Sequence, residues 1–280
     1  MIAACTAWGL SAIYYKLLDH VPPLEILSHR ILWSFVLFFA ILVVRRRTLA
    51  FFDLLRPSRT LIAVVFASLM VSANWFLFIW AVQYDRILET SLGYFTQPLV
   101  AVVFGVWLFS ERPKRLQWIA ILLAALAVLL LTLWLGKLPW VSLVLAVTFA
   151  LYGVIKKRMT AGSTVSVTAE ALILLPVALG WLWITHGGSD GAGAFGADLG
   201  DSLLLIFSGV LTAGPLMLMS YAAQRIPMTD VGVLQYVNPS LQFICAVVIF
   251  SEPFSLAHGV AFGLIWTALI LYTWSEFRRS

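Results

Sequence analysis

Long runs without charged side chains alternate with short polar segments along almost the whole chain. A helix needs about 20 apolar residues to cross the hydrocarbon core of a membrane, and most of these runs reach that length. They cover residues 60–84, 90–110, 116–136, 138–155, 171–189, 202–224, 231–251 and 253–275. Residues 1–18 and 24–44 predict two further spans, each of which carries charged residues. The pattern therefore predicts an all-α integral membrane protein with ten transmembrane helices.

Matching residues recur at a constant spacing of 141 positions. The pairs are Leu10 and Leu151, Lys16 and Lys157, Gln83 and Gln224, Pro98 and Pro239, and Glu111 and Glu252. Residues 1–137 and 138–280 are therefore predicted to be two copies of one five-helix unit. Because each copy has an odd number of spans, the second enters the membrane from the opposite side, and the repeats are inverted.

The basic residues predict which side of the membrane each connection occupies, because cytoplasmic loops collect Lys and Arg. If the N-terminus is cytoplasmic, 14 of the 18 basic residues fall in cytoplasmic segments. The external segments then hold only Arg86 and Lys137, while Lys16 and Arg30 lie within spans. We expect both termini to be cytoplasmic and residues 187–200 to form a flexible external loop. The net charge of +5 is then a topology signal and does not indicate nucleic-acid binding.

The composition agrees with a membrane protein, with 62% hydrophobic and 11% charged residues and a mean hydropathy of +0.98. Soluble domains carry about 25% charged residues. The chain has no GxxxxGK[ST], HExxH, CxxC or GxSxG motif, and its four histidines are scattered in the sequence. We therefore expect no enzyme activity, cofactor or metal. Cys5 and Cys245 fall inside spans and are expected to be buried thiols.

Two prolines at matching positions, Pro98 and Pro239, predict interrupted helices in the two halves. A proline leaves the carbonyl four residues before it without its helical donor, here the carbonyls of Tyr94 and Gln235. In lipid such a carbonyl must meet protein, water or a solute. Paired interruptions of this kind indicate the binding site of a transporter. The alternative is that the prolines only shape helix packing.

Polar side chains gather on the same face of the two proline-containing spans. Tyr94 and Gln97 share a face in residues 90–110, and their repeat mates Gln235 and Asn238 share a face in residues 231–251. Polar side chains at this depth rarely face lipid. We expect these four side chains to line a substrate cavity, although hydrogen bonding between helices is an alternative role.

Further candidates lie on neighbouring spans. Asn74 and Trp80 fall in residues 60–84, and Tyr221, the repeat mate of Trp80, falls in residues 202–224. An aromatic ring beside an amide can hold a flat or amphipathic solute, but Trp is also common at membrane interfaces. His29 and Arg30 are candidates because ionisable residues within a span are often functional. The weaker candidates for the cavity wall are Trp8 and Tyr152.

The glutamates have mainly structural interpretations. Glu25 is expected at the outer interface, and Arg30 could reach outward past it. Glu170 is expected to pair with Lys156 or Lys157 inside the protein, with a role in substrate binding as the alternative. Glu111 and Glu252 follow matching spans, where a carboxylate opposes the helix macrodipole and requires compensation. Arg112 and Arg115 could compensate Glu111, whereas Glu252 has no basic neighbour in the sequence.

Several segments resemble a known family. They are EILSHRILWS at 25–34, NWFLFIWAV at 74–82, SLGYF at 91–95 and LQYVNP at 234–239. They look like the RarD-type permeases of the EamA family, in the drug/metabolite transporter superfamily. The resemblance implies ten helices, a bacterial inner-membrane location and export of drugs or small metabolites, with chloramphenicol linked to the family name. Family members usually carry a short cytoplasmic leader, which is missing before the first span here.

The sequence thus predicts a secondary transporter that moves small organic solutes by alternating access. Its expected partners are a small-molecule substrate and the lipid bilayer, with no nucleic acid, and a monomer is sufficient for this role. An intramembrane enzyme would require a clustered nucleophile, metal set or carboxylate pair within the spans. A non-transporting membrane scaffold would not require the matched amide faces.

Overall fold

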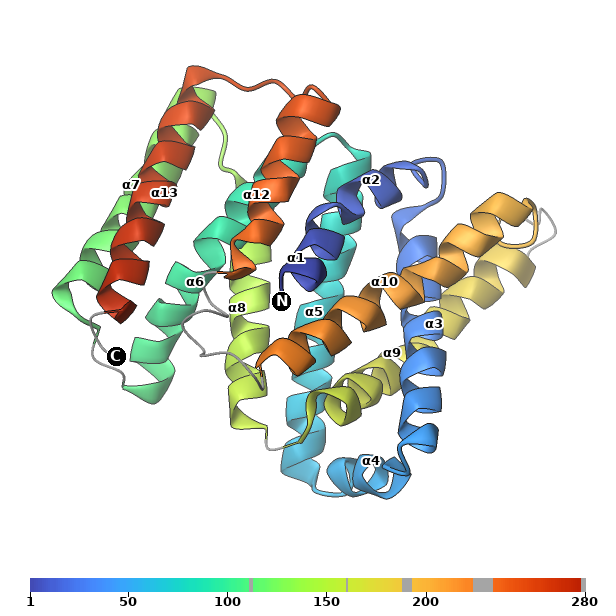
Figure 1. Cartoon of the computed structure of the whole chain (residues 1–280). Coiled ribbons are helices and arrows are strands. Elements are labelled where there is room, and N and C mark those ends of the chain that lie inside the picture. Colours follow the sequence, from blue (N-terminus) through green and yellow to red (C-terminus); the bar gives the residue numbers. More distant parts are fainter. Residues whose placement is uncertain (111–112, 160, 188–192, 224–233, 278–280) are drawn as a thin grey trace.

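The computed structural model describes residues 1–110, 113–159, 161–187, 193–223 and 234–277 (Figure 1). Helices account for most of these residues, and Phe195 and Asp198 form an isolated β-bridge. The first half contains α1 (Ile2–Gly9), α2 (Ser11–Lys16), α3 (Pro23–Val44), α4 (Thr48–Leu55), α5 (Ser58–Gln83), α6 (Ile87–Phe109) and α7 (Arg115–Leu135). The second half contains α8 (Trp140–Arg158), α9 (Ser163–Gly187), α10 (Leu199–Ala223), α12 (Val237–Ile244), the π-helical turn η1 (Cys245–Ile249) and α13 (Leu256–Phe277).

Within the described residues, eight helices are long and apolar enough to cross a membrane. They are α3, α5, α6, α7, α8, α9, α10 and α13. The first predicted span, residues 1–18, is instead divided at Leu10 into two short helices, α1 and α2. The Ser11 hydroxyl donates to the Trp8 carbonyl at 2.6 Å, a local bond that competes with regular helix geometry. The predicted span 231–251 lies partly outside the described residues, and its described part forms α12 and η1.

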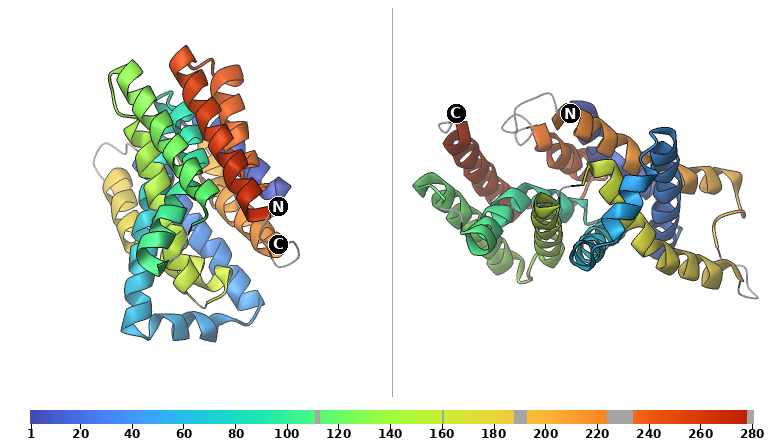
Figure 2. Two further views of the ribbon diagram at one scale, coloured as in Figure 1. Left: turned by 90° about the vertical axis from the view of Figure 1, so that its left-hand side faces the viewer. Right: turned by 90° about the horizontal axis from the view of Figure 1, so that it is seen from below.

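The helices pack in two groups joined by α5, α6 and α8 (Figures 1 and 2). At one side α7 lies beside α13, and at the other α3 packs against α9 and α10. Between them α6 packs on α8, while α1 contacts α10 and α12. The short helix α4 was not predicted from the sequence. It forms because Phe51, 2% exposed, packs between Leu42 and Val64 in a small apolar cluster with α9.

The spacing found in the sequence recurs in the structure. Helices α5 and α10 begin at Ser58 and Leu199, and α7 and α13 begin at Arg115 and Leu256, in each case 141 residues apart. Ser110 and Ser251, separated by the same spacing, both adopt the left-handed conformation with φ of 53°. Non-glycine residues seldom adopt positive φ. The two halves therefore share local backbone geometry as well as sequence.

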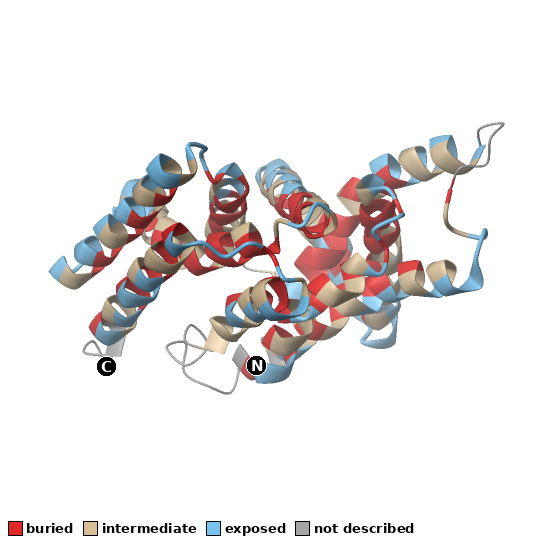
Figure 3. Cartoon of the chain, turned by 90° about the horizontal axis from the view of Figure 1, so that it is seen from above, coloured by how far each residue is buried: buried red, intermediate tan, exposed pale blue. Residues whose placement is uncertain are grey.

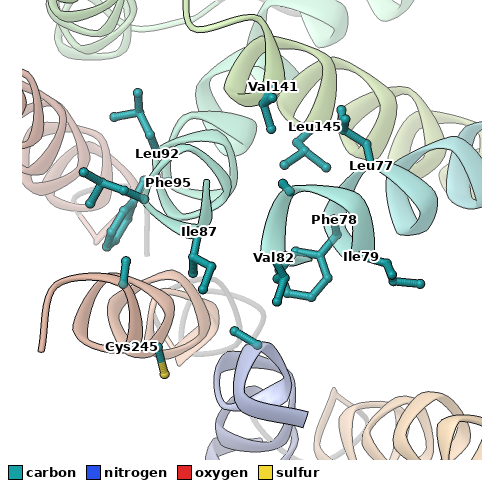
Figure 4. Packing of buried hydrophobic residues seen from close by; sticks show 14 of the residues in the cluster. Leu77, Phe78, Ile79, Val82, Ile87, Leu92, Phe95, Val141, Leu145 and Cys245 are labelled. Carbon is teal, nitrogen blue, oxygen red and sulfur yellow. The ribbon is translucent and has the colours of Figure 1, made fainter. Parts of the chain in front are cut away.

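Buried side chains gather toward the middle of the molecule, and exposed ones lie on the outward sides of the peripheral helices (Figure 3). Part of the main apolar cluster joins α5, α6, α8 and η1, with Phe78, Phe95, Leu145 and Cys245 among its members (Figure 4). Both cysteines are buried free thiols, as predicted. Large apolar side chains on the outside, such as Trp183 at 80% exposure, are typical of a surface that faces lipid.

Two glycines allow close contacts between the central helices. A Cβ atom on Gly9 of α1 would lie 2.6 Å from the Leu241 Cβ of α12. A Cβ atom on Gly93 of α6 would lie 2.8 Å from the Ser142 carbonyl of α8. Small residues let helix backbones approach each other closely, as is common in membrane proteins. These contacts hold α1 and α6 in the positions from which they line the central cavity.

Candidate functional site

A cavity of about 160 Å³ lies between the two halves of the chain. Helices α1, α2, α3, α5, α6, α8, α10 and α12 all contribute to its wall. Of the candidates predicted from the sequence, the cavity brings together Arg30, Asn74, Tyr94, Gln97, Gln235 and Asn238, with Pro98 and Pro239. Trp8 and Tyr152, the weaker wall candidates, line it as well. Matching positions of the two halves thus face one common space.

Asn74 and Tyr94 form a hydrogen-bonded pair on one wall. The Tyr94 hydroxyl donates to Asn74 Oδ1 at 2.8 Å. Asn74 is fully buried, and its Nδ2 donates to the Leu145 carbonyl and to Thr148 Oγ1, both at 3.0 Å. The amide therefore fixes the tyrosine ring relative to α8. This arrangement keeps a rigid aromatic face at the cavity surface.

A second polar group ties α6 to α12. Thr90 Oγ1 donates to Gln242 Oε1 at 2.9 Å, and Gln242 Nε2 donates to Asn238 Oδ1 at the same distance. Ser91 Oγ also donates to the Pro239 carbonyl at 2.8 Å. Part of the predicted amide face therefore bonds between helices, which was the alternative role considered for it. Asn238 accepts from Gln242 through Oδ1 and also lines the cavity.

Gln97 and Gln235 differ from these bonded amides. Both line the cavity, and neither side chain has a hydrogen-bond partner in the part of the chain that the structure describes. Each amide offers donors and an acceptor. They lie beside Pro98 and Pro239, so unpaired polar groups from both halves converge on the same space. Water or a solute within the cavity could satisfy them.

Arg30 is the charged group at the cavity wall. Its side chain is only 5% exposed, and it does not reach outward to the interface as the sequence had allowed. Its Nε donates to Thr212 Oγ1 at 2.8 Å and its guanidinium donates to the Tyr15 hydroxyl at 2.7 Å. Its Cζ lies 4.1 Å from the centre of the Trp75 ring. Among the described residues, no carboxylate pairs with this buried cation.

An ion pair lies beside the wall formed by Tyr152. Lys156 Nζ lies 2.7 Å from Glu170 Oε1, so the internal ion pair expected for Glu170 is present. The Tyr152 hydroxyl donates to Glu170 Oε2 at 3.0 Å, and Lys156 also contacts Ser166. Glu170 is 2% exposed and its charge is balanced by Lys156. The unbalanced charge in the cavity wall therefore comes from Arg30.

Three of the predicted substrate-binding candidates are not among the residues that line the cavity. Trp80 lies outside the cavity lining and stacks on Tyr84 with ring centres 4.9 Å apart. His29, adjacent to Arg30 in sequence, also lies outside it and stacks on Phe195. Helix α10 includes Tyr221, but its side chain is outside the described residues, as is Gln224. Gln83 has a structural contact, because its Nε2 donates to the carbonyls of Leu18 and Val21.

Glu252 positions helix α6 from the other half of the chain. Its carboxylate accepts the backbone N–H groups of Ile87 at 2.6 Å and Leu88 at 2.8 Å, in the first turn of α6. The N-terminal end of a helix carries partial positive charge, which compensates this carboxylate. Burial raises the pKa of Glu252, whereas the two N–H donors lower it. Its repeat mate Glu111, and the predicted compensation by Arg112, lie outside the described residues.

Sequence reasoning missed several aromatic and polar wall residues. They are Tyr15, Phe78, Phe149 and Thr212. Phe149 lies one helical turn from Tyr152, so helical spacing could have indicated it. Thr212 contributes through its bond to Arg30, and no local sequence feature marks that contact.

Comparisons with known proteins agree with this architecture. The sequence profile of the "EamA-like transporter family" matches the chain twice, over residues 1–133 and 138–274. The "Uncharacterized transporter YojE" of Bacillus subtilis is 39% identical, with 96% of this chain and 90% of that protein covered. The "Protein RarD" of Streptomyces exfoliatus is 40% identical over 98% of this chain and 86% of that protein. A solved crystal structure with 18% identity has a TM-score of 0.64, covers 96% of this chain and 94% of that one, and shows a shared fold.

These features define a multi-pass membrane protein of a transporter class. The chain belongs to the EamA-like transporter family, as a RarD-type permease.

Proposed function

We propose that this protein is a secondary transporter that moves a small organic solute with an anionic or strongly hydrogen-bond-accepting group. The cavity between the halves would be its binding site, opened to either side of the bacterial inner membrane by alternating access. Export is the direction suggested by the resemblance to RarD-type permeases. The observation that carries the substrate class is the buried guanidinium of Arg30, which has no carboxylate partner among the described residues.

A buried cation is unfavourable unless it is paired and hydrogen-bonded. The Tyr15 and Thr212 hydroxyls satisfy part of the Arg30 hydrogen-bonding capacity but supply no negative charge. A carboxylate or similar group of a solute could supply it, with the bidentate geometry that guanidinium favours. The amides of Gln97 and Gln235 could then bind other polar atoms of the same molecule.

The remaining wall favours a small molecule with a flat or apolar part. Trp75, Phe78, Tyr94 and Phe149 present aromatic surface to the cavity. Pockets for drug-sized ligands usually have volumes of about 300–1,000 Å³, larger than the 160 Å³ of this cavity. A small aromatic or aliphatic acid is therefore favoured over a bulky drug in this conformation.

The function is tested by solute flux in proteoliposomes, with and without an imposed pH gradient. Small aromatic acids and their uncharged amides form matched pairs that differ mainly in charge. We expect uptake or release of acids above the level of protein-free liposomes, and weaker transport of the amides. Proteoliposomes with folded protein that move neither class would contradict the proposed function. Equal transport of acids and amides would contradict the assigned role of Arg30 alone.

We also propose that residues 1–137 and 138–280 are inverted five-helix repeats, giving ten spans with both termini in the cytoplasm. The recurring helix starts and the matching φ of Ser110 and Ser251 support two equivalent units. In this topology α1 with α2, and α12 with η1, would supply the two spans beyond the eight long helices. Interrupted helices are tolerated at membrane depth where they line a cavity.

Cysteine labelling tests this topology. Lys137, between α7 and α8, should be external, and Arg56, between α4 and α5, should be cytoplasmic. In a background with Cys5 and Cys245 replaced by Ala, we expect an impermeant maleimide to label Lys137→Cys in intact cells. Arg56→Cys should react only after the cells are broken. The reverse pattern would show that the orientation is wrong, and labelling of both from one side would contradict the three spans, α5, α6 and α7, that separate the two sites.

A further inference from the structure

Three potential metal-ligating side chains meet at one end of α3 and α9, outside the central cavity. Glu25 and His29 lie one helical turn apart on α3, and His186 lies in the last turn of α9. Their ligand atoms all lie within 4.8 Å of one another. The two helices pack side by side, so residues 161 positions apart in sequence are brought together (Figure 1).

The polar atoms of this cluster lack the partners that buried groups normally have. Glu25 Oε2, both ring nitrogens of His29 and His186 Nε2 are buried without a hydrogen-bond partner in the described part of the chain. Glu25 is fully buried and His29 is 3% exposed. An unsatisfied buried polar group destabilises the folded protein, so four in one place require an explanation.

Neighbouring contacts orient these atoms toward one another. His186 Nδ1 lies 3.0 Å from the Leu182 carbonyl and 3.1 Å from Thr185 Oγ1, and a hydrogen bond to the carbonyl requires the tautomer with the proton on Nδ1. In the neutral ring, Nε2 then presents its lone pair, and it lies 3.6 Å from Glu25 Oε1. Histidines that bind metals are usually held in this way through the other ring nitrogen.

The segment before α10 closes over the cluster. The backbone N–H of Ala194 donates to Glu25 Oε1 at 2.7 Å, and the Phe195 ring stacks on His29 with centres 4.8 Å apart. A Cβ atom on Gly193 would overlap the His186 ring. This part of the predicted flexible loop is therefore packed against the protein. Its contacts place this segment directly on Glu25 and His29, while the His186 side chain remains 30% exposed at the edge.

We propose that Glu25, His29 and His186 form a binding site for a divalent transition-metal ion of the Zn²⁺ type. Two imidazole nitrogens and one carboxylate are a common ligand set for Zn²⁺, with a water or another group in the fourth position. Ligands about 2.0–2.1 Å from a tetrahedral ion lie about 3.3 Å from one another, close to the observed separation of Glu25 Oε1 and His186 Nε2. Side-chain rotation that draws His29 inward completes the set.

The metal ion would join α3 and α9 at the predicted external face, beside the segment before α10. It would coordinate one ring nitrogen of each histidine and the Glu25 carboxylate, and it would fix the end of the helix that carries Arg30. The site does not depend on the proposed transport activity, because none of its ligands lines the central cavity. Binding of the metal ion can therefore be measured on purified protein without a transported solute.

The test uses protein purified without a histidine tag, treated with chelator and then titrated with Zn²⁺ or Co²⁺. We expect Zn²⁺ to raise the melting temperature progressively with concentration, as a ligand of the folded state does. Co²⁺ should give the visible absorption bands of a tetrahedral site with nitrogen and oxygen ligands. A bound stoichiometry of one ion per chain is expected by elemental analysis after desalting.

Two variants separate metal binding from a structural role. His29→Leu removes a ring whose nitrogens have no partner, so the metal-free protein should melt no lower than wild type, but the response to Zn²⁺ and the Co²⁺ bands should disappear. Glu25→Gln keeps an oxygen that can accept the Ala194 N–H and should weaken Zn²⁺ binding at least tenfold. His258→Ala, a histidine on α13 outside the cluster, should respond like wild type. A Zn²⁺ response that is absent from wild type, or unchanged in His29→Leu, would overturn the proposal.

Discussion

Arg30→Leu is expected to abolish transport of anionic solutes while leaving the solute-free protein as stable as wild type. The guanidinium is buried without a carboxylate partner among the described residues, so the folded protein does not gain an ion pair from it. Burying an unpaired charge is unfavourable, so an apolar side chain at this position is not expected to destabilise the fold. The bound solute, in contrast, would lose its charged partner, which typically weakens binding by about 2–5 kcal/mol, or roughly 30-fold or more.

The measurement combines solute flux, equilibrium binding and melting temperature for the same preparations. Arg30→Lys keeps the charge but loses the planar fork, so we expect partial binding and slower transport. Arg86→Leu is the matched control, because Arg86 pairs with Glu89 at 2.9 Å and lies outside the cavity. It should transport like wild type. Normal flux in Arg30→Leu, with full protein recovery, would show that the cation serves another purpose.

The sequence predicted much of the helical framework because membrane spans have a strong local signal. Pro98 and Pro239, with the polar faces beside them, could be located from spacing alone, since the repeat placed equivalent residues in the two halves. The structure brings both prolines to the same cavity. The division of residues 1–18 at Leu10 was missed because an apolar run does not reveal how Ser11 bonds to the backbone.

The direction of individual side chains was harder to predict. Arg30 lies near a helix end, from which a long side chain can reach either the interface or the protein interior. Its inward position depends on Tyr15, Trp75 and Thr212, which come from three other helices. Trp80 and His29 had equally plausible local signals but meet other aromatic rings instead of the cavity. Such choices depend on tertiary contacts that a single sequence does not specify.

The clusters formed between distant segments were invisible in the sequence. The four histidines looked unrelated, yet His29 and His186 meet beside Glu25 once α3 packs on α9. Glu252 presented a similar difficulty, because its compensating charge comes from the start of a helix 165 positions earlier. A carboxylate with no basic neighbour in sequence was an indication of such a contact, but it could not identify the partner.

Glu252→Ala is expected to destabilise the protein by about 2–4 kcal/mol, the second large effect predicted from the structure. The substitution removes both acceptors for the first backbone N–H groups of α6, and an unsatisfied buried donor costs about 1–3 kcal/mol. These N–H groups belong to Ile87 and Leu88, which are 0% and 5% exposed. Water therefore does not readily replace the carboxylate as their hydrogen-bond acceptor. The favourable interaction between the carboxylate and the helix N-terminus is lost as well.

The same change should impair the cavity, because α6 carries Tyr94, Gln97 and Pro98. Thermal melting of the purified protein should show a fall of about 5 °C or more, since roughly 1 kcal/mol shifts the midpoint by about 2–4 °C in chains of 150–250 residues. Glu252→Gln retains one accepting oxygen and should fall between Ala and wild type. An intermediate melting temperature would measure the loss of the charge and one hydrogen bond. The further fall in Glu252→Ala would then measure the loss of the remaining hydrogen bond.

Glu89→Gln provides the matched control at the same end of α6. Its carboxylate pairs with Arg86 at 2.9 Å, and the side chains of the pair are about one-fifth exposed, while its other oxygen, Oε2, is buried without a partner among the described residues. Such pairs contribute about 0–1 kcal/mol. If Glu252→Ala melted no lower than Glu89→Gln, the two N–H groups would be satisfied by other means, and the contact between the halves would not stabilise α6. A large difference between the two variants would instead show that a carboxylate from the second half holds a cavity helix of the first.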